Sequence, residues 1–199
     1  MTGSTGGTRW AGAWRRTLLE TGDGARDETT DVTWVQGPEI FVDLRVGADA
    51  VEGFAGTFET AGDRATWHRE IDLGPTPKHP DTGDLRLDGE VLVETGVHAS
   101  YVEHWRACGP VGPVGSLRTR LVGGGELLGA RAGGRVGLAW SDPSSGPVIA
   151  ILRPAGASLR VRTASRPALV DRSVDLRPEG IPALGLTFAH PITTEGEWV

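Results

Sequence analysis

The chain has 199 residues, including 30 glycines and 13 prolines, and it carries 26 acidic against 20 basic side chains for a formal net charge of −6. This turn-rich composition favours an all-β fold, and a hydrophobic content of 38% is enough for one sizeable core or two small ones. A single cysteine, Cys108, excludes an internal disulfide and Cys-ligated zinc sites. The acidic balance argues against nucleic-acid binding, and no apolar run is long enough for a membrane helix.

Several common functional motifs are missing from the sequence. Lys78 is the one lysine, so there is no Gly-Lys-Ser/Thr phosphate loop, and the patterns G-x-S-x-G, H-E-x-x-H and a strand-anchored G-x-G-x-x-G are absent. These absences argue against the common nucleotide-binding, hydrolase, metalloprotease and dinucleotide classes. Residues 1–8 show neither a basic start nor an apolar stretch, so we expect a cytoplasmic protein.

The first elements along the chain include one ambiguous segment and one clear strand. Residues 11–20 suit either a short helix or a first strand. Residues 40–46 alternate strictly, with aliphatic side chains on one face and Phe41, Asp43 and Arg45 on the other, which predicts a strand.

The next predicted strands carry polar groups beside aromatic ones. Residues 66–72 alternate, placing Trp67, Arg69 and Ile71 on one face. Residues 91–97 and 101–107 are separated by a three-residue gap and predict a hairpin. The second arm of this hairpin places Tyr101, Glu103 and Trp105 on a common face.

A Gly/Pro-rich linker at 107–113 divides the chain. Residues 1–106 are predicted to form the first part of a barrel, and 114–199 a meander that completes the barrel or forms a second lobe. Short apolar segments at regular spacing support the meander, at 116–122, 126–130, 135–140, 148–152, 158–163 and 184–189. Closing so many strands into a barrel removes exposed edges, so we expect an antiparallel barrel rather than an open sheet.

A polar cluster on three of these strands is the first candidate site. Asp43 and Arg45 face the same way, and Glu94, Tyr101 and Glu103 lie on strands that could be their neighbours. If this face lines a barrel interior, the arginine held by carboxylates would bind an anion or carbonyl, and a glutamate or the tyrosine could move a proton. The alternative is a structural ion-pair network that fixes the barrel end.

Histidines and tryptophans supply further candidates. His68, His79, His98 and His104 lie near acidic residues, so a metal or haem site is an open alternative, although we predict no cofactor and no metal. Trp67 and Trp105 fall in predicted strands, where an indole fills barrel volume or lines an apolar cup for a ligand. The loop 77–80 is expected to be rigid, and it either covers a barrel mouth or is a simple connection.

Ordered short motifs across residues 28–106 resemble the fungal Hri family, lipocalin-like proteins named for interaction with a yeast casein kinase. The matching segments are Glu28–Asp31, Phe41–Arg45, Phe54–Gly56, Ala65–Asp72, Asp81–Asp84, Val93–Gly96 and Tyr101–Arg106. The chain departs from the family pattern where His68 stands one place early and where Val102 replaces an acid, and its second half matches poorly. The resemblance implies an antiparallel lipocalin-like barrel of the calycin type, followed by a smaller barrel-like part, and it implies no reaction.

These observations predict a binder of a small, partly apolar molecule, oriented by Arg45 and Asp43 and contacted by Trp67, Tyr101 and Trp105. The alternative is a cofactor-independent enzyme, such as a cyclase, isomerase, lyase or dehydratase, in which Glu94, Glu103 or His68 acts as acid or base. A third hypothesis is an interaction module for a protein partner, whose barrel would be filled by side chains. Neither nucleic acid nor membrane is an expected partner, and the oligomeric state is open.

Overall fold

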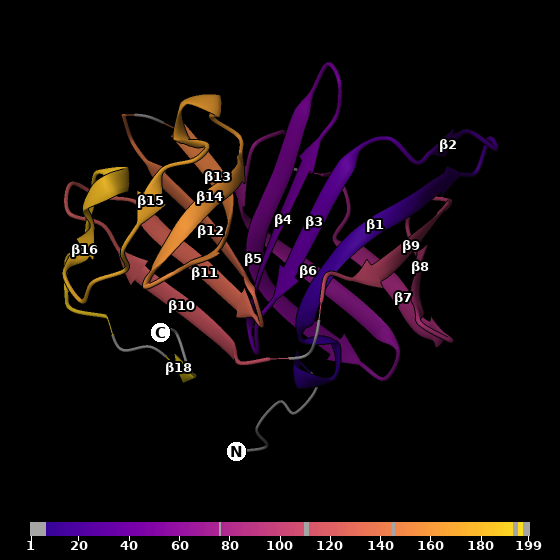
Figure 1. Ribbon diagram of the computed structural model, residues 1–199. Coiled ribbons are helices and arrows are strands. Elements are labelled where there is room, and N and C mark those ends of the chain that lie inside the picture. The colour runs from indigo at the N-terminus through magenta and orange to yellow at the C-terminus, as the bar shows by residue number, and fades with distance from the viewer. Residues whose placement is uncertain (1–6, 76, 110–111, 145, 193–194, 197–199) are drawn as a thin grey trace.

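The computed structural model describes residues 7–75, 77–109, 112–144, 146–192 and 195–196, and in these ranges the chain is all-β (Figure 1). Short 3-10 helices occur at Gly7–Trp10, Pro167–Leu169 and Pro182–Leu184. None of the helices in the described part is long and apolar enough to cross a membrane.

The first part of the chain forms a barrel of eight antiparallel strands, counted over the described residues. Each strand pairs with the next along the chain, and β1 pairs with β9 to close the ring. Residues 11–20 are therefore a strand and not a helix. The barrel strands are β1 (Gly12–Thr21), β3 (Asp31–Gln36), β4 (Ile40–Val46), β5 (Val51–Ala61), β6 (Arg64–Asp72), β7 (Asp81–Asp88), β8 (Val91–Gly96) and β9 (Tyr101–Ala107), with the short β2 (Arg26–Asp27) beside β1.

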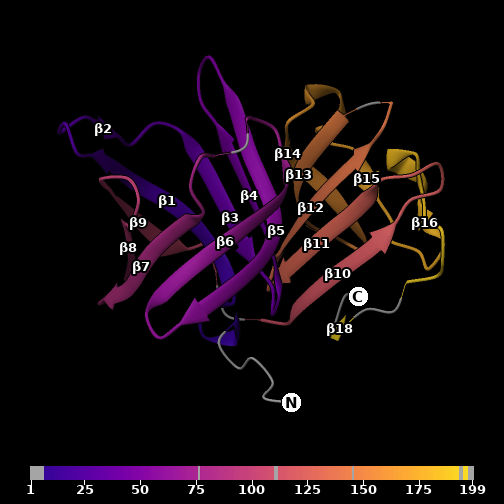
Figure 2. The same ribbon diagram turned by 180° about the vertical axis from the view of Figure 1, so that it is seen from behind.

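The second part forms a separate antiparallel sheet that lies against the barrel in both views (Figures 1 and 2). Because the barrel already closes between β1 and β9, these strands do not complete it. The sheet has the order β15-β14-β13-β12-β11-β10-β18. Its strands are β10 (Val114–Arg120), β11 (Glu126–Ala132), β12 (Arg135–Asp142), β13 (Gly146–Ala155), β14 (Ser158–Ala164), β15 (Ser173–Val174) and β18 (Glu195–Gly196).

The segment 184–189 differs from its prediction. Only Leu186 and Thr187 are in a strand, β17, which pairs with β16 (Gly180–Ile181). The side chains of Leu186 and Phe188 are nevertheless buried, because they cover the face of the second sheet that points away from the barrel. An apolar segment that covers a sheet shows the same composition as a strand within one, so the pattern did not distinguish the two.

Three apolar cores give the molecule its layers. One fills the barrel and is mainly aromatic, including Trp34, Trp67 and Trp105. A second joins the outer face of the barrel to the second sheet and includes Val42 of β4 and Ile149 of β13. The third lies between the second sheet and the C-terminal segments. Burial of a large aliphatic side chain contributes about 1.5–3 kcal/mol, so the shared core holds barrel and sheet together.

The alternation of β4 explains how the barrel is polar inside. Val42 and Leu44 pack outward into the core shared with the second sheet, and this leaves Phe41, Asp43 and Arg45 facing the barrel interior. The two faces predicted from the sequence are confirmed. The polar face of β4 lies inside the barrel because its aliphatic face is buried against the second sheet.

Strand β6 departs from strict alternation. Its register against β5 shifts between Ile71 and Arg69, which marks a β-bulge. Trp67 therefore lies inside the barrel while Ile71 packs outside, and the prediction that both share one face is wrong. A Cβ at Gly56, opposite the bulge, would overlap the His68 carbonyl oxygen, so glycine permits the close approach of the two strands.

Candidate functional site

The predicted polar cluster comes together at one end of the barrel. Asp43 and Arg45 come from β4, Glu94 from β8, and Tyr101 and Glu103 from β9. The register pairs Glu94 directly with Glu103, so two carboxyl groups lie side by side on the inner face of the hairpin. The side chains of Asp43, Glu94 and Glu103 are all buried.

Two arginines neutralise part of this acidic cluster. The guanidinium of Arg16 donates to Glu103 Oε1 at 2.7 Å and to Asp27 Oδ2 at 2.6 Å. Arg45 Nε donates to Asp43 Oδ1 at 2.8 Å, and its Nη1 lies 3.6 Å from Glu103 Oε1. Glu103 is thus shared between two cations. Charges this deeply buried are tolerated because each is paired.

Glu94 lacks such a cation within hydrogen-bonding distance among the described residues. Its Oε1 accepts from the Tyr101 hydroxyl at 2.8 Å and its Oε2 from the indole N–H of Trp105 at 3.2 Å. Burial, followed by the charge of Glu103, raises the pKa of Glu94 well above its ordinary value. This shift favours the protonated form of Glu94, and a protonated carboxyl group can donate a hydrogen bond or a proton.

The neighbouring groups are also shifted. Burial is the main cause that raises the pKa of Tyr101, with Glu94 adding to it, so the phenol keeps its proton. Burial raises the pKa of Asp43 against the opposing charge of Arg45. Burial acts to lower the pKa of Arg45, but Asp43 and Glu103 together raise it well above its ordinary value, so Arg45 stays charged.

The interior below this network is filled by aromatic side chains. The Trp34 ring centroid lies 5.6 Å from those of both Trp67 and Trp105, in edge-to-face contacts. The remaining cavity, bounded by these rings together with Arg45, Glu94 and others, measures about 10 Å³. This is space for about one water molecule. Trp67 and Trp105 therefore act here mainly as core residues.

A larger cavity of about 270 Å³ lies above the network, between the β6–β7 and β8–β9 connections. It is lined by Arg69, Asp81 and Tyr101 and by the predicted mouth loop, including Lys78 and His79. Asp81 borders both cavities, so the upper one adjoins the buried network. Arg69 connects them, since it pairs with Asp81 at 2.7 Å and lies 3.5 Å above the Phe54 ring.

The structure does not bring His68 to this site. Its ring is about half exposed on the outside of β6 and lies 2.8 Å from Glu59. His79 and His98 stack at the mouth, with ring centroids 5.4 Å apart. Over the described residues there is no group of three His, Cys, Asp or Glu side chains that could hold a metal ion.

Sequence reasoning missed Arg16 and Arg69 as parts of the site. Arg16 lies in the segment 11–20, which suited a helix as well as a strand, so the direction of its side chain was undetermined. Arg69 was placed on the same face as Trp67, and that face is the interior. The available signal was that an arginine on an aromatic strand face needs a buried partner.

The fold and site define an all-β protein with a closed eight-stranded antiparallel barrel, counted over the described residues, and a polar network at one barrel end. No family model matches the chain, and no curated protein is similar to it. The fold is similar to the crystal structure of the uncharacterized protein YLR301w from Saccharomyces cerevisiae, with a TM-score of 0.66 at 13% identity over 92% of this chain and 98% of that chain. This likeness is one of fold, and the resemblance to the Hri family stays a prediction.

Proposed function

We propose that the protein binds a small, partly apolar molecule at the end of the barrel, in the cavity between the loop 77–80 and the polar network. The observation that carries the proposal is a buried network, including Glu94 with its raised pKa, that adjoins a cavity of about 270 Å³ through Tyr101 and Asp81. This volume is just below the usual range for ligand pockets, about 300–1,000 Å³, which favours a ligand smaller than a typical drug.

The polar groups favour a ligand that carries a hydrogen-bond acceptor such as a carbonyl. In the structure the Tyr101 hydroxyl donates to Glu94. When Glu94 is protonated, its own O–H can become the donor of this bond, and the Tyr101 hydroxyl can then donate into the cavity. Arg69, which lines the same cavity, supplies a second donor. In this proposal Trp67 and Trp105 form the floor beneath the network, and Asp43 holds Arg45 in place.

The test is a nuclear magnetic resonance screen of the isotope-labelled protein against a library of small carbonyl and carboxylate compounds. The indole N–H signal of Trp105 is a direct reporter, because that group donates to Glu94. We expect hits to shift this signal together with the backbone signals of Tyr101 and His98. Tyr101→Phe should weaken binding by up to about tenfold, as expected for the loss of one hydrogen bond.

The matched control is Thr17→Val, a hydroxyl removed from the outside of the barrel, where Thr17 bonds only the His104 carbonyl. This variant should bind each hit as the unmodified protein does. A library that shifts none of the Trp105, Tyr101 and His98 signals would overturn the proposal. So would hits whose affinity is unaffected by Tyr101→Phe.

The raised pKa of Glu94 specifically favours a second candidate, an enzyme without a cofactor that uses this acid as proton donor and Arg45 to stabilise negative charge. Glu103 is the poorer candidate for proton transfer, because its Oε1 already contacts two arginines. If a hit is also converted, Glu94→Gln should abolish turnover and leave the affinity nearly unchanged. Loss of affinity and turnover together would contradict a role in the chemical step.

A further inference from the structure

A groove between the barrel and the second sheet concentrates positive charge. It measures about 520 Å³ and is lined by five arginines, which we call the arginine groove. These are Arg15 of β1, Arg106 of β9, Arg135 of β12, Arg153 of β13 and Arg162 of β14. The one carboxylate among the lining residues is Asp31. The groove is thus a local reversal of charge in a chain whose net charge is −6.

The ion pairs of these arginines are long and exposed. Arg15 lies 3.3 Å from Asp31, Arg106 lies 3.6 Å from Glu90, and Arg162 lies 3.8 Å from Asp171. Arg135 donates to the carbonyl of its own neighbour, Gly134, at 3.3 Å. Arg153 has no ion pair or hydrogen bond within the described residues. Exposed pairs of this kind contribute about 0–1 kcal/mol, so the guanidinium groups are available to a ligand.

The strand registers place like charges opposite each other. Arg15 is the direct partner of Arg106 in the β1–β9 pair. In the β12–β13 pair, Val136 and Leu152 are the last paired residues at this end, so Arg135 and Arg153 are the next residues along their two strands. Like charges at paired positions destabilise a sheet. Burial and the charge of Arg153 also lower the pKa of Arg135. An anion bound between these pairs would relieve the repulsion.

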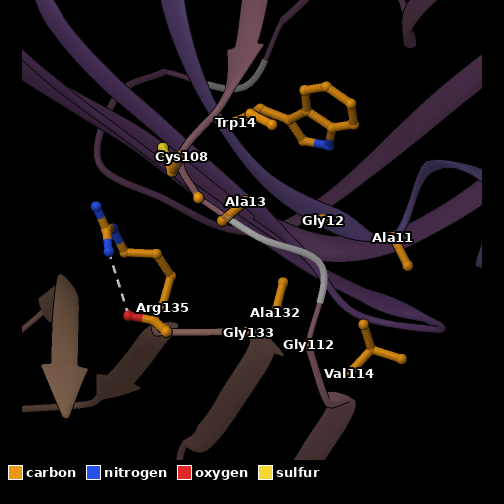
Figure 3. A pocket seen from close by; sticks show the side chains of 13 residues that line it. Ala11, Gly12, Ala13, Trp14, Cys108, Gly112, Val114, Ala132, Gly133 and Arg135 are labelled. Carbon is orange, nitrogen blue, oxygen red and sulfur yellow. Dashed lines mark hydrogen bonds between the residues drawn. The ribbon is translucent and has the colours of Figure 1, made fainter.

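An apolar pocket of about 210 Å³ adjoins the arginine groove, and Ala107, Cys108 and Arg135 line both. Figure 3 shows Arg135 and Cys108 on one side of this pocket and Trp14, Ala132 and Val114 around the rest. The charged and apolar spaces are therefore adjacent. Together they suit a molecule with an anionic head and an uncharged body.

We propose that the arginine groove binds a small organic phosphate that carries several negative charges, with the uncharged part of the molecule in the adjoining pocket. Arginine is suited to this task because its planar fork donates two parallel hydrogen bonds to a phosphate group. The site is separate from the barrel end, since none of its lining residues belongs to the Glu94 network.

The first experiment measures binding of tripolyphosphate to the full chain by isothermal titration calorimetry, with citrate as an anion of another chemistry. We expect tripolyphosphate to bind, more weakly as salt is added, and to bind more tightly than citrate. Arg135→Gln combined with Arg153→Gln should weaken binding by about tenfold or more per arginine, the loss expected for a charge-assisted hydrogen bond. Equal binding of citrate and tripolyphosphate would overturn the assignment to phosphate.

The matched control is Arg120→Gln, an exposed arginine of β10 that lies outside the groove. It removes the same charge and should leave the affinity unchanged. Because the double variant removes like-charge repulsion, we expect it to be at least as stable as the unmodified protein without ligand, so misfolding would not confuse the result. Equal affinities for the double variant and the control would overturn the proposal.

Cys108 provides an independent readout, because it is the sole cysteine and lines both spaces. Tripolyphosphate should slow its alkylation by iodoacetamide, both by covering the thiol and by disfavouring the thiolate. Adenosine triphosphate, which adds an uncharged body to the same head, should bind more tightly than tripolyphosphate. Unchanged alkylation with bound tripolyphosphate would place the anion elsewhere, and weaker binding of adenosine triphosphate would overturn the role of the apolar pocket.

Discussion

At the scale of single residues, the barrel end is a balance of buried charges. Arg16 and Arg45 have carboxylate partners in Glu103, Asp27 and Asp43, whereas Glu94 is buried without such a cation and its pKa is raised. This division follows from geometry, because no guanidinium among the described residues bonds the Glu94 carboxyl group. Glu94 and Glu103 are cross-strand partners, yet we expect different effects on stability when each is changed.

Glu94→Gln should change how stability depends on pH. The pKa of Glu94 is raised in the fold, so the folded protein holds a proton that the unfolded chain releases above about pH 4. The stability from this proton is full at low pH and is lost as the pH rises through the folded pKa. Glutamine is neutral throughout and avoids the loss. In thermal unfolding from pH 5 to 8, the melting temperature of the variant minus that of the unmodified protein should increase, and a constant difference would contradict this account.

Glu103→Gln should destabilise the protein at every pH in the same range. It leaves Arg16 and Arg45 buried with one partner fewer each, and breaking a buried pair in this way costs about 3–5 kcal/mol. Urea denaturation gives the measurement. Glu59→Gln is the control, because it removes an exposed carboxylate that contacts only His68, and it should change the urea midpoint little. A Glu103 variant as stable as this control would refute the buried network as a source of stability.

At the scale of elements, the contact between β4 and β12 limits what the shared core can accept. A Cβ on Gly137 of β12 would lie 2.6 Å from the Val42 Cβ of β4, closer than side-chain atoms approach. Glycine at 137 is therefore set by the approach of the sheet to the barrel and not by a turn.

Gly137→Ala should destabilise the protein by about 1–3 kcal/mol, the usual cost of overpacking a core. Gly134→Ala is a matched control three residues earlier, since nothing lies within 4 Å of its added Cβ. Urea denaturation of both variants distinguishes the two positions. A Gly137 variant as stable as the Gly134 variant would mean that the two layers separate readily at this point.

The elements also show what the sequence could and could not predict. Strict alternation in 40–46 placed Asp43 and Arg45 together, because period two is a property of the strand itself. The bulge at β6 could not be read, since it depends on how β5 approaches, and this moved Ile71 to the outer face. His68 was grouped with the glutamates by proximity in sequence, yet it points out of the barrel. The face of a strand on which each residue lies could be predicted from alternation, whereas the side chains that it contacts depend on the strand register.

At the scale of the whole molecule, the barrel and the second sheet share one core, so neither covers its apolar face alone. We therefore expect a single cooperative unfolding transition. Scanning calorimetry should give one peak whose calorimetric enthalpy equals its van't Hoff enthalpy. Two peaks, or a calorimetric enthalpy well above the van't Hoff value, would show that the two layers unfold separately. The Gly/Pro composition of 107–113 suggested a boundary, but only the structure shows how much apolar surface crosses it.

The uneven placement of the tryptophans has an optical consequence. Trp10, Trp14, Trp34, Trp67 and Trp105 all belong to the barrel, whereas Trp140 lies in the far core of the second sheet. Indole rings at 5.6 Å in edge-to-face contact couple electronically, so the near-ultraviolet circular dichroism of this chain reports the packing around Trp34. The seventh tryptophan, Trp198, lies outside the described residues, so replacing both Trp140 and Trp198 with phenylalanine would leave emission from the barrel tryptophans alone. The near-ultraviolet signal of this protein therefore reports mainly on the packing of the barrel, and the second sheet needs a different probe.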